Sequence, residues 1–323
     1  MVNQKKNRVA VVVIGRNEGE RLACSLDSLS ESSLSVSYVD SGSSDDSVVL
    51  AKCRGVHTIE LDSAKPFSAA RARNEGFIYH LKISPNIEFI QFLDGDCEIS
   101  HDWLETAVSF FDKNPDVAVV AGRLREKNPE LSVYNKLCDF EWSVPTGQAI
   151  SCGGISLMRV SALKTVGGFR EDLVAGEEPE LCLRLRLAGW KIWRLNAEMA
   201  RHDAAMFHFS EWWKRCVRTG FGYAQLCHDF GLYCKESMRC IIWAGVLPIL
   251  TILSVLSASS LMPSVLLLLP IIRVILGAIL KGNTRDSWLL CSFQMLGKFP
   301  EFQGLLRYVF NRLEIPIKLK SFS

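Results

Sequence analysis

Short apolar runs alternate with segments of helical periodicity along the first hundred residues. Apolar and β-branched runs of this kind are typical of strands buried on both faces, as in a parallel sheet. Such runs occur at 9–15, 36–40, 56–61 and 88–96. Helices are expected between them, at 21–30, 47–55 and 67–82. The alternation predicts βαβ units with right-handed crossovers, and therefore an α/β fold with a Rossmann-like, mainly parallel sheet flanked by helices.

Three of these strands end at residues suited to ligand binding. Gly15 ends the first strand, Asp40 ends the second, and Asp94 lies near the end of the fourth. In open α/β sheets, ligands bind at the carboxyl ends of the strands. We therefore expect a binding site at this edge of the sheet.

The middle of the chain, about 115–205, continues as mixed α/β structure. Strands are expected there at 117–124 and 190–195, and helices at 161–169 and 178–190. One catalytic α/β domain is therefore expected to cover residues 1–234.

The hydropathy pattern changes after Met238. Residues 240–259 carry no charge, and 261–280 carry only Arg273. Each segment is near the roughly 20 apolar residues that span a bilayer. The pattern predicts a membrane-associated helical region at 235–323, with a hydrophobic hairpin at about 240–280 and an amphipathic tail at 286–323 on the membrane surface.

The basic residues that flank the hairpin on its outer sides are Lys235, Arg239, Lys281 and Arg285. Under the positive-inside rule, both long ends of the chain then lie in the cytoplasm. Prolines at 248, 263 and 270 leave open whether the hairpin spans the bilayer or re-enters it. The alternative is a pair of buried core helices in a soluble domain.

Composition narrows the classes of function. The net charge of +2 does not indicate a protein that binds nucleic acid. The eleven cysteines form no C-x-x-C pair, which argues against a disulfide framework and a structural zinc site, and favours reduced thiols in the cytosol. The short apolar run near the N-terminus is interpreted as a first strand rather than a signal peptide.

The sequence "FLDGDCEIS" at 92–100 places two carboxylates one residue apart at a strand end. On an extended chain, Asp94 and Asp96 point the same way and can converge on one hard divalent cation. A polar turn is the alternative interpretation. Asp40 can accept hydrogen bonds from a base or a ribose, and the alternative there is an Asx turn, which Asp45 and Asp46 are expected to form.

Several motifs occur in a characteristic order: "VVVIGRNEGERL", "YVDSGSSDDS", "AARARNEGF", "FLDGDCEI", "GGISLMRVSALKTVGGFREDL" and "GEEPELCLRLRLAGW". Over roughly residues 8–230, the chain resembles the family 2 glycosyltransferases, which have the GT-A fold. The stretches "RHDAAM", "WWKRCVRTG" and "GKFPE" resemble bacterial membrane-associated enzymes of exopolysaccharide or other surface-glycan assembly.

The resemblance implies roles for individual residues of a nucleotide-sugar site. The donor-binding residues would be Glu18, Asp40, Arg73, Asp94, Gly153 and Gly154. The metal ligands for Mg²⁺ or Mn²⁺ would be Asp94, Asp96 and His202. Asp96 would ligate the metal directly, and Asp94 would hold the ribose or a metal-bound water. Ser41 stands where the family usually has a second acidic residue.

The catalytic base is expected in "GEEPEL". Glu178 occupies the position where the family usually has aspartate, and Glu177 is the alternative base. Pro179 suits the first position of a helix, which would leave Glu178 at or near the N-cap. The alternative is that these acidic residues only favour the helix dipole.

Arg215 and Arg218 precede the hairpin and would contact the phosphates of a lipid-linked acceptor or of membrane lipids.

The resemblance implies an inverting enzyme at the cytoplasmic face of the bacterial inner membrane. It would move one sugar from a nucleotide-sugar donor, UDP-linked by expectation, to a lipid-linked saccharide, beside other glycan-assembly enzymes. A sugar-phosphate nucleotidyltransferase-like enzyme and a non-catalytic membrane scaffold are the alternatives.

Overall fold

The computed structural model describes residues 8–30, 34–257 and 262–313. The chain forms two compact units. The first comprises Met1–Leu173 and Glu177–Ala205, and the second comprises Val174–Gly176 and Met206–Ser323. This division falls earlier than the boundary expected after residue 234, because the helix that begins at Phe209 packs within the second unit.

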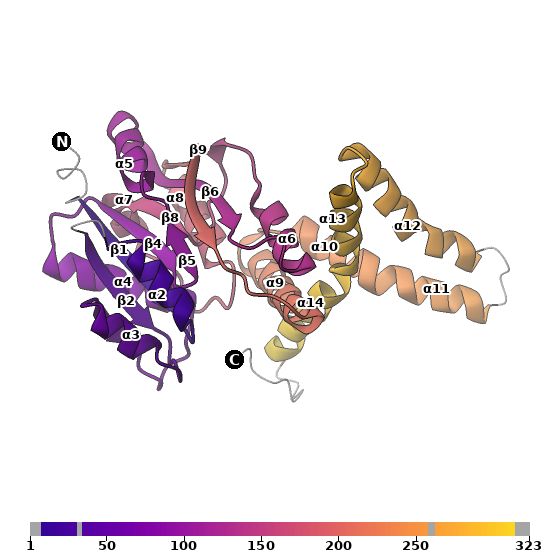
Figure 1. Ribbon diagram of the computed structural model, residues 1–323. Coiled ribbons are helices and arrows are strands. Elements are labelled where there is room, and N and C mark those ends of the chain that lie inside the picture. The colour runs from indigo at the N-terminus through magenta and orange to yellow at the C-terminus, as the bar shows by residue number, and fades with distance from the viewer. Residues whose placement is uncertain (1–7, 31–33, 258–261, 314–323) are drawn as a thin grey trace. The chain divides into compact units, whose positions relative to one another are not determined.

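The first unit contains the sheet and its flanking helices (Figure 1). Its strands are β1 Val9–Gly15, β2 Ser35–Asp40, β3 His57–Glu60, β4 Phe89–Asp94, β5 Cys97–Ile99, β6 Val117–Glu126, β7 Gly147–Ala149, β8 Ser156–Arg159 and β9 Lys191–His202. Its helices are α2 Glu20–Asp27, α3 Ser47–Cys53, α4 Ala69–Ile83, α5 Trp103–Lys113, α6 Val133–Trp142, α7 Val160–Val166 and α8 Glu177–Leu187.

The strands join in the order β3-β2-β1-β4-β8-β6-β9-β5, with β7 beside β9. Strands β1 to β4 pair in parallel, and β8 runs antiparallel between β4 and β6. This confirms the predicted α/β, GT-A-like architecture. β1 is buried along nearly its whole length, as its β-branched sequence predicts.

Register explains why polar residues meet at one edge of this sheet. Gly15 pairs with Asp40 across β1 and β2, and Ile14 pairs with Asp94 across β1 and β4. The carboxyl ends of three neighbouring strands therefore lie level with one another. A ligand at this edge would meet all three ends, as expected for open α/β sheets.

β9 is longer than the hydropathy pattern predicts, and β5 is an additional strand that the pattern does not predict. β9 continues to His202, well past the expected end near residue 195, and β5 follows the aspartate pair directly. β5 pairs antiparallel with β9, so that Cys97 lies opposite His202. This pairing brings two segments far apart in sequence to the same place.

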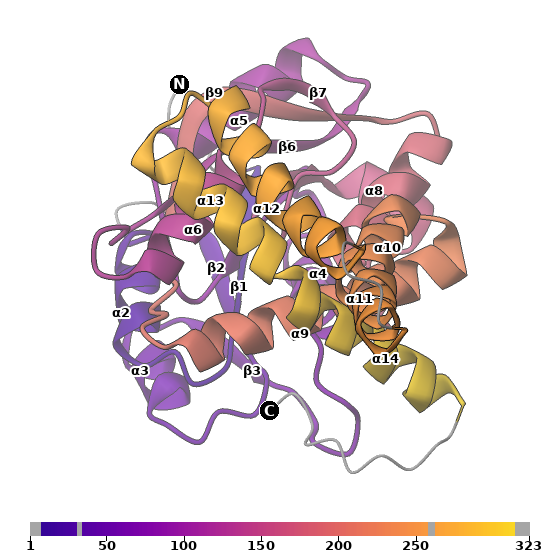
Figure 2. The ribbon, with the colours of Figure 1, turned by 90° about the vertical axis from the view of Figure 1, so that its right-hand side faces the viewer.

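The second unit is helical. Its elements are α9 Phe209–Phe230, α10 Cys234–Cys240, η1 Ile241–Val246, α11 Leu247–Leu256, α12 Met262–Leu280, α13 Arg285–Leu296 and α14 Lys298–Arg312. α9 and α14 cross closely, because a Cβ on Gly220 would lie 1.9 Å from the carbonyl oxygen of Glu301. A Cβ on Gly304 would lie 2.0 Å from the carbonyl oxygen of Val217. The expected amphipathic tail thus forms two helices, of which α14 packs on α9 and α13 on α12 (Figure 2).

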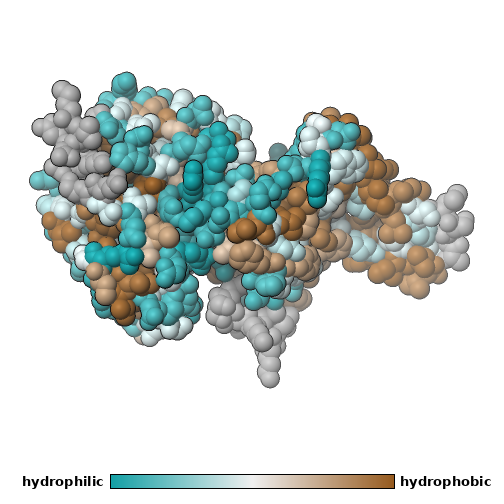
Figure 3. Space-filling model, in the orientation of Figure 1, coloured by the Kyte–Doolittle hydropathy of each residue, from teal (hydrophilic) through white to brown (hydrophobic). Residues whose placement is uncertain are grey.

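The apolar hairpin forms two long helices, Cys234–Leu256 and Met262–Leu280. Both are long and apolar enough to cross a membrane, and few of their residues are buried. Figure 3 shows hydrophobic residues along α11 and α12. The guanidinium of Arg273 lies 5.2 Å from the ring centre of Trp243. Exposed apolar helices do not fit the alternative of buried core helices.

Cysteine pairing differs from the expectation of reduced thiols alone. Cys227 and Cys234 form a disulfide, with Cα atoms 4.8 Å apart. α9 ends at Gly231, which adopts a left-handed conformation and reverses the chain between the two cysteines. C-x-x-C spacing does not reveal such a pair, because the two cysteines are seven residues apart and a turn brings them together. Residues 1–7, the hairpin linker at 258–261 and the tail at 314–323 lie outside the described residues.

Candidate active site

Asp96 and His202 lie together at the carboxyl edge of the sheet. The Nε2 atom of His202 is 3.2 Å from Oδ2 of Asp96. The β5–β9 pairing positions them, and the backbone N–H of Asp203 donates to the carbonyl oxygen of Asp96 at 2.9 Å. The structure therefore brings together two of the predicted metal ligands, which are 106 residues apart in sequence.

Glu126 lies on the other side of His202. β6 and β9 pair in parallel with Glu126 opposite His202, and its side chain is fully buried. Oε2 of Glu126 is 3.7 Å from Nδ1 of His202 and accepts the backbone N–H of Ala204 at 3.1 Å. A carboxylate behind a ligating histidine fixes the ring and its tautomer in metal sites. Glu126 is thus placed to orient His202.

Charge coupling in this group is strong. Burial alone would lower the pKa of His202, but its contacts with Asp96 and Glu126 raise that pKa to about 9. Burial would raise the pKa of Asp96, but His202 holds it below the usual value. Without a bound cation, His202 is therefore an imidazolium held between carboxylates.

Glu18 adds a third carboxylate beside the aspartate pair. Its Cγ packs against Gly15 and Gly95, where an added Cβ would lie at 2.9 Å and 3.1 Å. Arg21 approaches Glu18 at 2.7 Å. Burial, and then the charge of Asp96, raises the pKa of Glu18 to about 7. Crowded carboxylates of this kind repel one another, and a divalent cation would relieve the repulsion.

Arg73 joins Asp94 to Glu177. It lies on α4, is almost fully buried, and contacts Oδ1 of Asp94 at 3.0 Å and Oε1 of Glu177 at 2.6 Å. Gly154 packs on the same guanidinium, since a Cβ there would lie 2.6 Å from its Nη2 atom. Gly153 adopts a φ of +93°, which favours glycine. Gly154 therefore lets the backbone approach Arg73 closely, and Gly153 allows the backbone turn that precedes it.

Glu178 points into a buried cluster. Its Oε1 accepts the backbone N–H of Cys152 at 2.6 Å and the thiols of Cys152 and Cys182 at 3.0 Å and 2.9 Å. Helix α8 begins at Glu177, so Glu178 lies within the first turn rather than at the N-cap. The helix starts earlier because Gly176, with a φ of +85°, ends the preceding loop.

Asp40 forms the turn that we expected from Asp45 and Asp46. Its Oδ2 accepts the backbone N–H groups of Gly42 and Ser43, and its Oδ1 accepts the Tyr38 hydroxyl. Asp45 forms a second such turn, accepting the backbone N–H of Ser47. Asp40 therefore holds the loop after β2 in place at the sheet edge.

The donor set fits a hard divalent cation. Asp96 and His202 offer an oxygen and a nitrogen within one group, whereas Asp94, whose Oδ1 pairs with Arg73, and Glu18 lie outside that group and act on it through their charges. Cys97 is also close, and burial raises the pKa of its thiol well above the usual value. Oxygen-rich ligands with an imidazole suit Mn²⁺ or Mg²⁺.

Sequence reasoning missed three residues of this region: Arg21, Glu126 and Trp142. Arg21 contacts Glu18, and Trp142 packs edge-on against His202 with ring centres 4.6 Å apart. Arg21 directly follows the "RNEGE" stretch that contains Glu18, and this three-residue spacing at the start of a helix is the sequence signal for their pairing. Arg215 and Arg218 lie on α9 in the second unit.

The fold of this chain is GT-A-like, and a solved glycosyltransferase that binds a nucleotide sugar shares it. Residues 10–167 match the family described as Glycosyl transferase family 2. That segment is just under half of the chain, and over it the chain is similar to the glycosyltransferases of this family.

Curated relatives of the chain are named as glycosyltransferases. The chain is 30% identical over 211 residues to a pre-mycofactocin glycosyltransferase of Mycobacterium tuberculosis, covering 60% of this chain and 42% of the relative. The chain thus spans less than half the length of this curated relative.

Solved structures share the fold. One is a mannosyltransferase from Pyrobaculum calidifontis in complex with GDP-Man and Mn²⁺, with 17% identity, a TM-score of 0.65, and coverage of 94% of this chain and 88% of that one. Another is the glucosyl-3-phosphoglycerate synthase of Mycobacterium tuberculosis with Mn²⁺ and UDP, with 17% identity, a TM-score of 0.50, and coverage of 72% and 84%. These structural relatives bind Mn²⁺ with nucleotides or nucleotide sugars.

Proposed function

We propose that this protein is an inverting glycosyltransferase that moves one sugar from a nucleotide-sugar donor, with UDP as the first candidate nucleotide, to a lipid-linked saccharide. The observation that carries the proposal is the continuous row of groups at the sheet edge. Arg73 joins Asp94 to Glu177, and Asp96 meets His202 at 3.2 Å. This row offers cation ligands, a buried guanidinium and a carboxylate base within one site.

The donor end of the site is formed by Glu18, Asp94, Asp96, Arg73 and His202. Asp96, His202 and Asp94 would hold Mg²⁺ or Mn²⁺, which supplies charge stabilisation for the departing diphosphate when bound. Arg73, kept charged by Asp94 and Glu177, is fixed beside that position and adds a permanent positive charge. Asp40 keeps the loop after β2 in shape for the nucleotide.

Glu178 is the proposed base, with Glu177 as the alternative. Glu177 is held by the guanidinium of Arg73, and taking up a proton would cost it this ion pair. Glu178 accepts hydrogen bonds only from neutral donors within the described part of the chain. The base would take the proton of the acceptor hydroxyl as its oxygen attacks the anomeric carbon opposite the leaving group. Replacing each residue by glutamine separates the roles, because only the base variant would lose transfer while keeping donor affinity.

The second unit supports a place at a membrane. Its exposed apolar hairpin would anchor the chain to a bacterial inner membrane, with the catalytic unit in the cytoplasm. Arg215 and Arg218 would then contact phosphates of a lipid-linked acceptor or of lipid headgroups. Synthesis of exopolysaccharide or another surface glycan, beside other enzymes of that assembly, is the pathway class this arrangement favours.

One screen tests the proposal. Purified protein in detergent is incubated with UDP- and GDP-sugars, with and without Mn²⁺, and with a lipid-linked acceptor. We expect metal-dependent binding of one donor and release of nucleoside diphosphate. Release of pyrophosphate would favour a nucleotidyltransferase, and failure to bind any nucleotide would favour a non-catalytic scaffold. Either result would overturn the proposal.

A further inference from the structure

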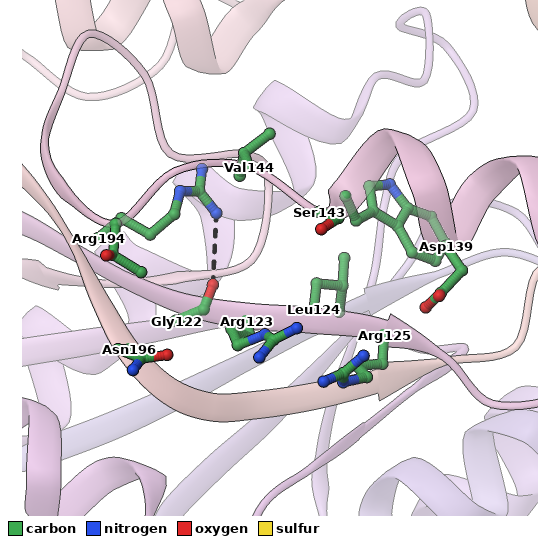
Figure 4. A pocket seen from close by; sticks show the side chains of 11 residues that line it. Gly122, Arg123, Leu124, Arg125, Asp139, Ser143, Val144, Arg194 and Asn196 are labelled. Carbon is green, nitrogen blue, oxygen red and sulfur yellow. Dashed lines mark hydrogen bonds between the residues drawn. The ribbon is translucent and has the colours of Figure 1, made fainter. Parts of the chain in front are cut away.

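A pocket opens in the first unit between β6, β9 and the loop that follows α6 (Figure 4). The residues lining it are Gly122, Arg123, Leu124, Arg125, Asp139, Trp142, Ser143, Val144, Thr146, Arg194 and Asn196. None of these belongs to the set that the donor and its cation would use. The pocket therefore adds a binding surface to the candidate active site.

Contacts join the pocket to both ends of that site. Arg194 donates to the carbonyl oxygens of Gly122, at 3.3 Å, and Cys152, at 3.0 Å. The N–H of Cys152 in turn donates to Glu178, the proposed base. On the other side, Trp142 packs edge-on against His202. A molecule in this pocket thus lies next to the groups that hold the base and the metal-ligating histidine.

The pocket is rich in guanidinium groups. Figure 4 shows Arg194 projecting from one strand, with Arg123 and Arg125 on the strand beside it. Asp139 is the carboxylate of the lining, and its Oδ1 accepts the backbone N–H of Glu126 at 3.1 Å. Glu198 is half-exposed and lies 3.9 Å from Arg123 and 3.3 Å from Arg125. The guanidinium donors outnumber the carboxylates that could satisfy them.

This chemistry selects for an anion. Guanidinium groups bind carboxylates and phosphates through paired N–H donors, and several together favour a multiply bonded oxyanion. Leu124, Trp142 and Val144 supply an apolar wall, which suits the C–H face of a sugar ring. A neutral sugar would offer these guanidinium groups no charged acceptor and therefore only weaker hydrogen bonds.

We propose that this pocket binds an oxyanion carried by the glycosyl acceptor, a phosphate or a carboxylate near the accepting hydroxyl. This inference rests on the proposed function, since it assigns the acceptor side of the same site. It places recognition of the anion on the sheet of the first unit, independently of Arg215 and Arg218 on α9. The pocket then orients the acceptor hydroxyl toward Glu178.

The test measures acceptor-like probes separately from the donor. Full-length protein in detergent is saturated with Mg²⁺ and the nucleoside diphosphate that it binds, so that the donor site is occupied. Glucose 6-phosphate, glucuronate and glucose are then titrated by calorimetry. We expect at least one anion to bind about tenfold or more tightly than glucose, as charge-assisted hydrogen bonds predict.

Two variants locate the binding. Arg123→Gln with Arg125→Gln removes two guanidinium groups from half-exposed positions and should weaken anion binding about tenfold, with nucleotide affinity kept. Arg54→Gln is the matched control, because Arg54 pairs with Asp27 elsewhere in the first unit. The control should bind all probes like the wild type.

The outcomes are distinct. Tighter binding of glucose 6-phosphate identifies phosphate as the oxyanion, and tighter binding of glucuronate identifies carboxylate. The inference is overturned if neither anion binds better than glucose, or if the double variant keeps wild-type anion affinity. Failure of nucleotide binding would instead overturn the proposed function, and the probes can then be titrated without nucleotide to test the pocket by itself.

Discussion

The two units of this protein differ in how far their apolar side chains are buried. In the first, β1 buries Val11, Val12 and Val13 completely between its neighbours in the sheet. In the second, Leu253 and Leu268 lie on helices of similar apolarity and stay about half exposed. Apolar surface is stabilised only when something covers it. The sheet covers its own strands, whereas most of the hairpin's described apolar side chains are left uncovered, and a lipid bilayer would cover them under the proposed membrane attachment.

The candidate active site and the proposed membrane anchor also belong to different units. The carboxylates, histidine and arginines of the candidate site all belong to the first unit. The hairpin carries Arg273 beside Trp243 and otherwise few charges among its described residues. Changes in one unit should therefore affect reaction or membrane binding selectively.

The largest effect is expected at Asp96. Asp96→Asn keeps the shape of the side chain but removes the charge that faces His202 at 3.2 Å. We expect metal-dependent donor binding to disappear and transfer to fall at least about a thousandfold, because several kcal/mol of charge stabilisation are lost. Membrane binding should not change. Asp102→Asn, at a highly exposed position, is the control. Near-normal transfer by Asp96→Asn would refute the metal site.

The next effect concerns the hairpin. Leu253→Asp with Leu268→Asp places two charges on its exposed apolar surface. Each aspartate costs about 3 kcal/mol at the centre of a membrane helix, so partition into phospholipid vesicles should fall at least about a hundredfold. Flotation of the protein with vesicles measures this partition, while Mn²⁺-dependent nucleotide binding should persist.

Val49→Asp is the matched control for the hairpin. Val49 lies on α3 in the first unit and is as exposed as Leu253. A charge there should leave vesicle partition unchanged. If both sets of variants partition alike, the hairpin is not the membrane anchor.

Some parts of the fold and of the candidate site can be predicted from the sequence, and others cannot. The β-branched run of β1 and the aspartate pair after β4 are local patterns, so they predict the sheet and half of the site directly. The role of Glu126 has no local signal, because it arises from the pairing of β6 with β9 over many residues. The place of α9 in the second unit likewise depends on a close crossing with α14, which no periodicity in α9 reveals.

A smaller effect is expected from His80 in the core of the first unit. Its Nε2 lies 3.1 Å from the carbonyl oxygen of Val11 and 3.0 Å from the hydroxyl of Ser37. Burial lowers the pKa of His80 from 6.5 to about 4. Between these pH values the unfolded chain binds the extra proton, so the free energy of unfolding falls as the pH is lowered from about 6.5 to 4.

The loss should reach about 3 kcal/mol at the lower end of this window. Urea unfolding across the window measures it, followed by a tryptophan signal from the first unit. His80→Gln should flatten the curve in this region. His101→Gln, at an exposed position, should leave it as in the wild type. An unchanged slope in His80→Gln would show that other groups cause the pH dependence.

The smallest effect tests whether α9 and α14 form a fixed pair. A methyl group on Gly220 would lie 1.9 Å from a backbone oxygen of Glu301, which cannot move without shifting α14. Gly220→Ala should therefore destabilise the second unit by about 2 kcal/mol, even though alanine favours helices. Gly245→Ala is the control, because its methyl group would meet only the ring tip of Phe302, at 2.9 Å.

Thermal unfolding in detergent compares the two glycine variants. A lower midpoint for Gly220→Ala, with nucleotide binding by the first unit retained, indicates that the cost falls on helix packing alone. Equal midpoints would mean that α14 moves freely enough to accept the methyl group. Gly220 would then not be required for the packing of α9 against α14, and the two helices would not form a fixed pair.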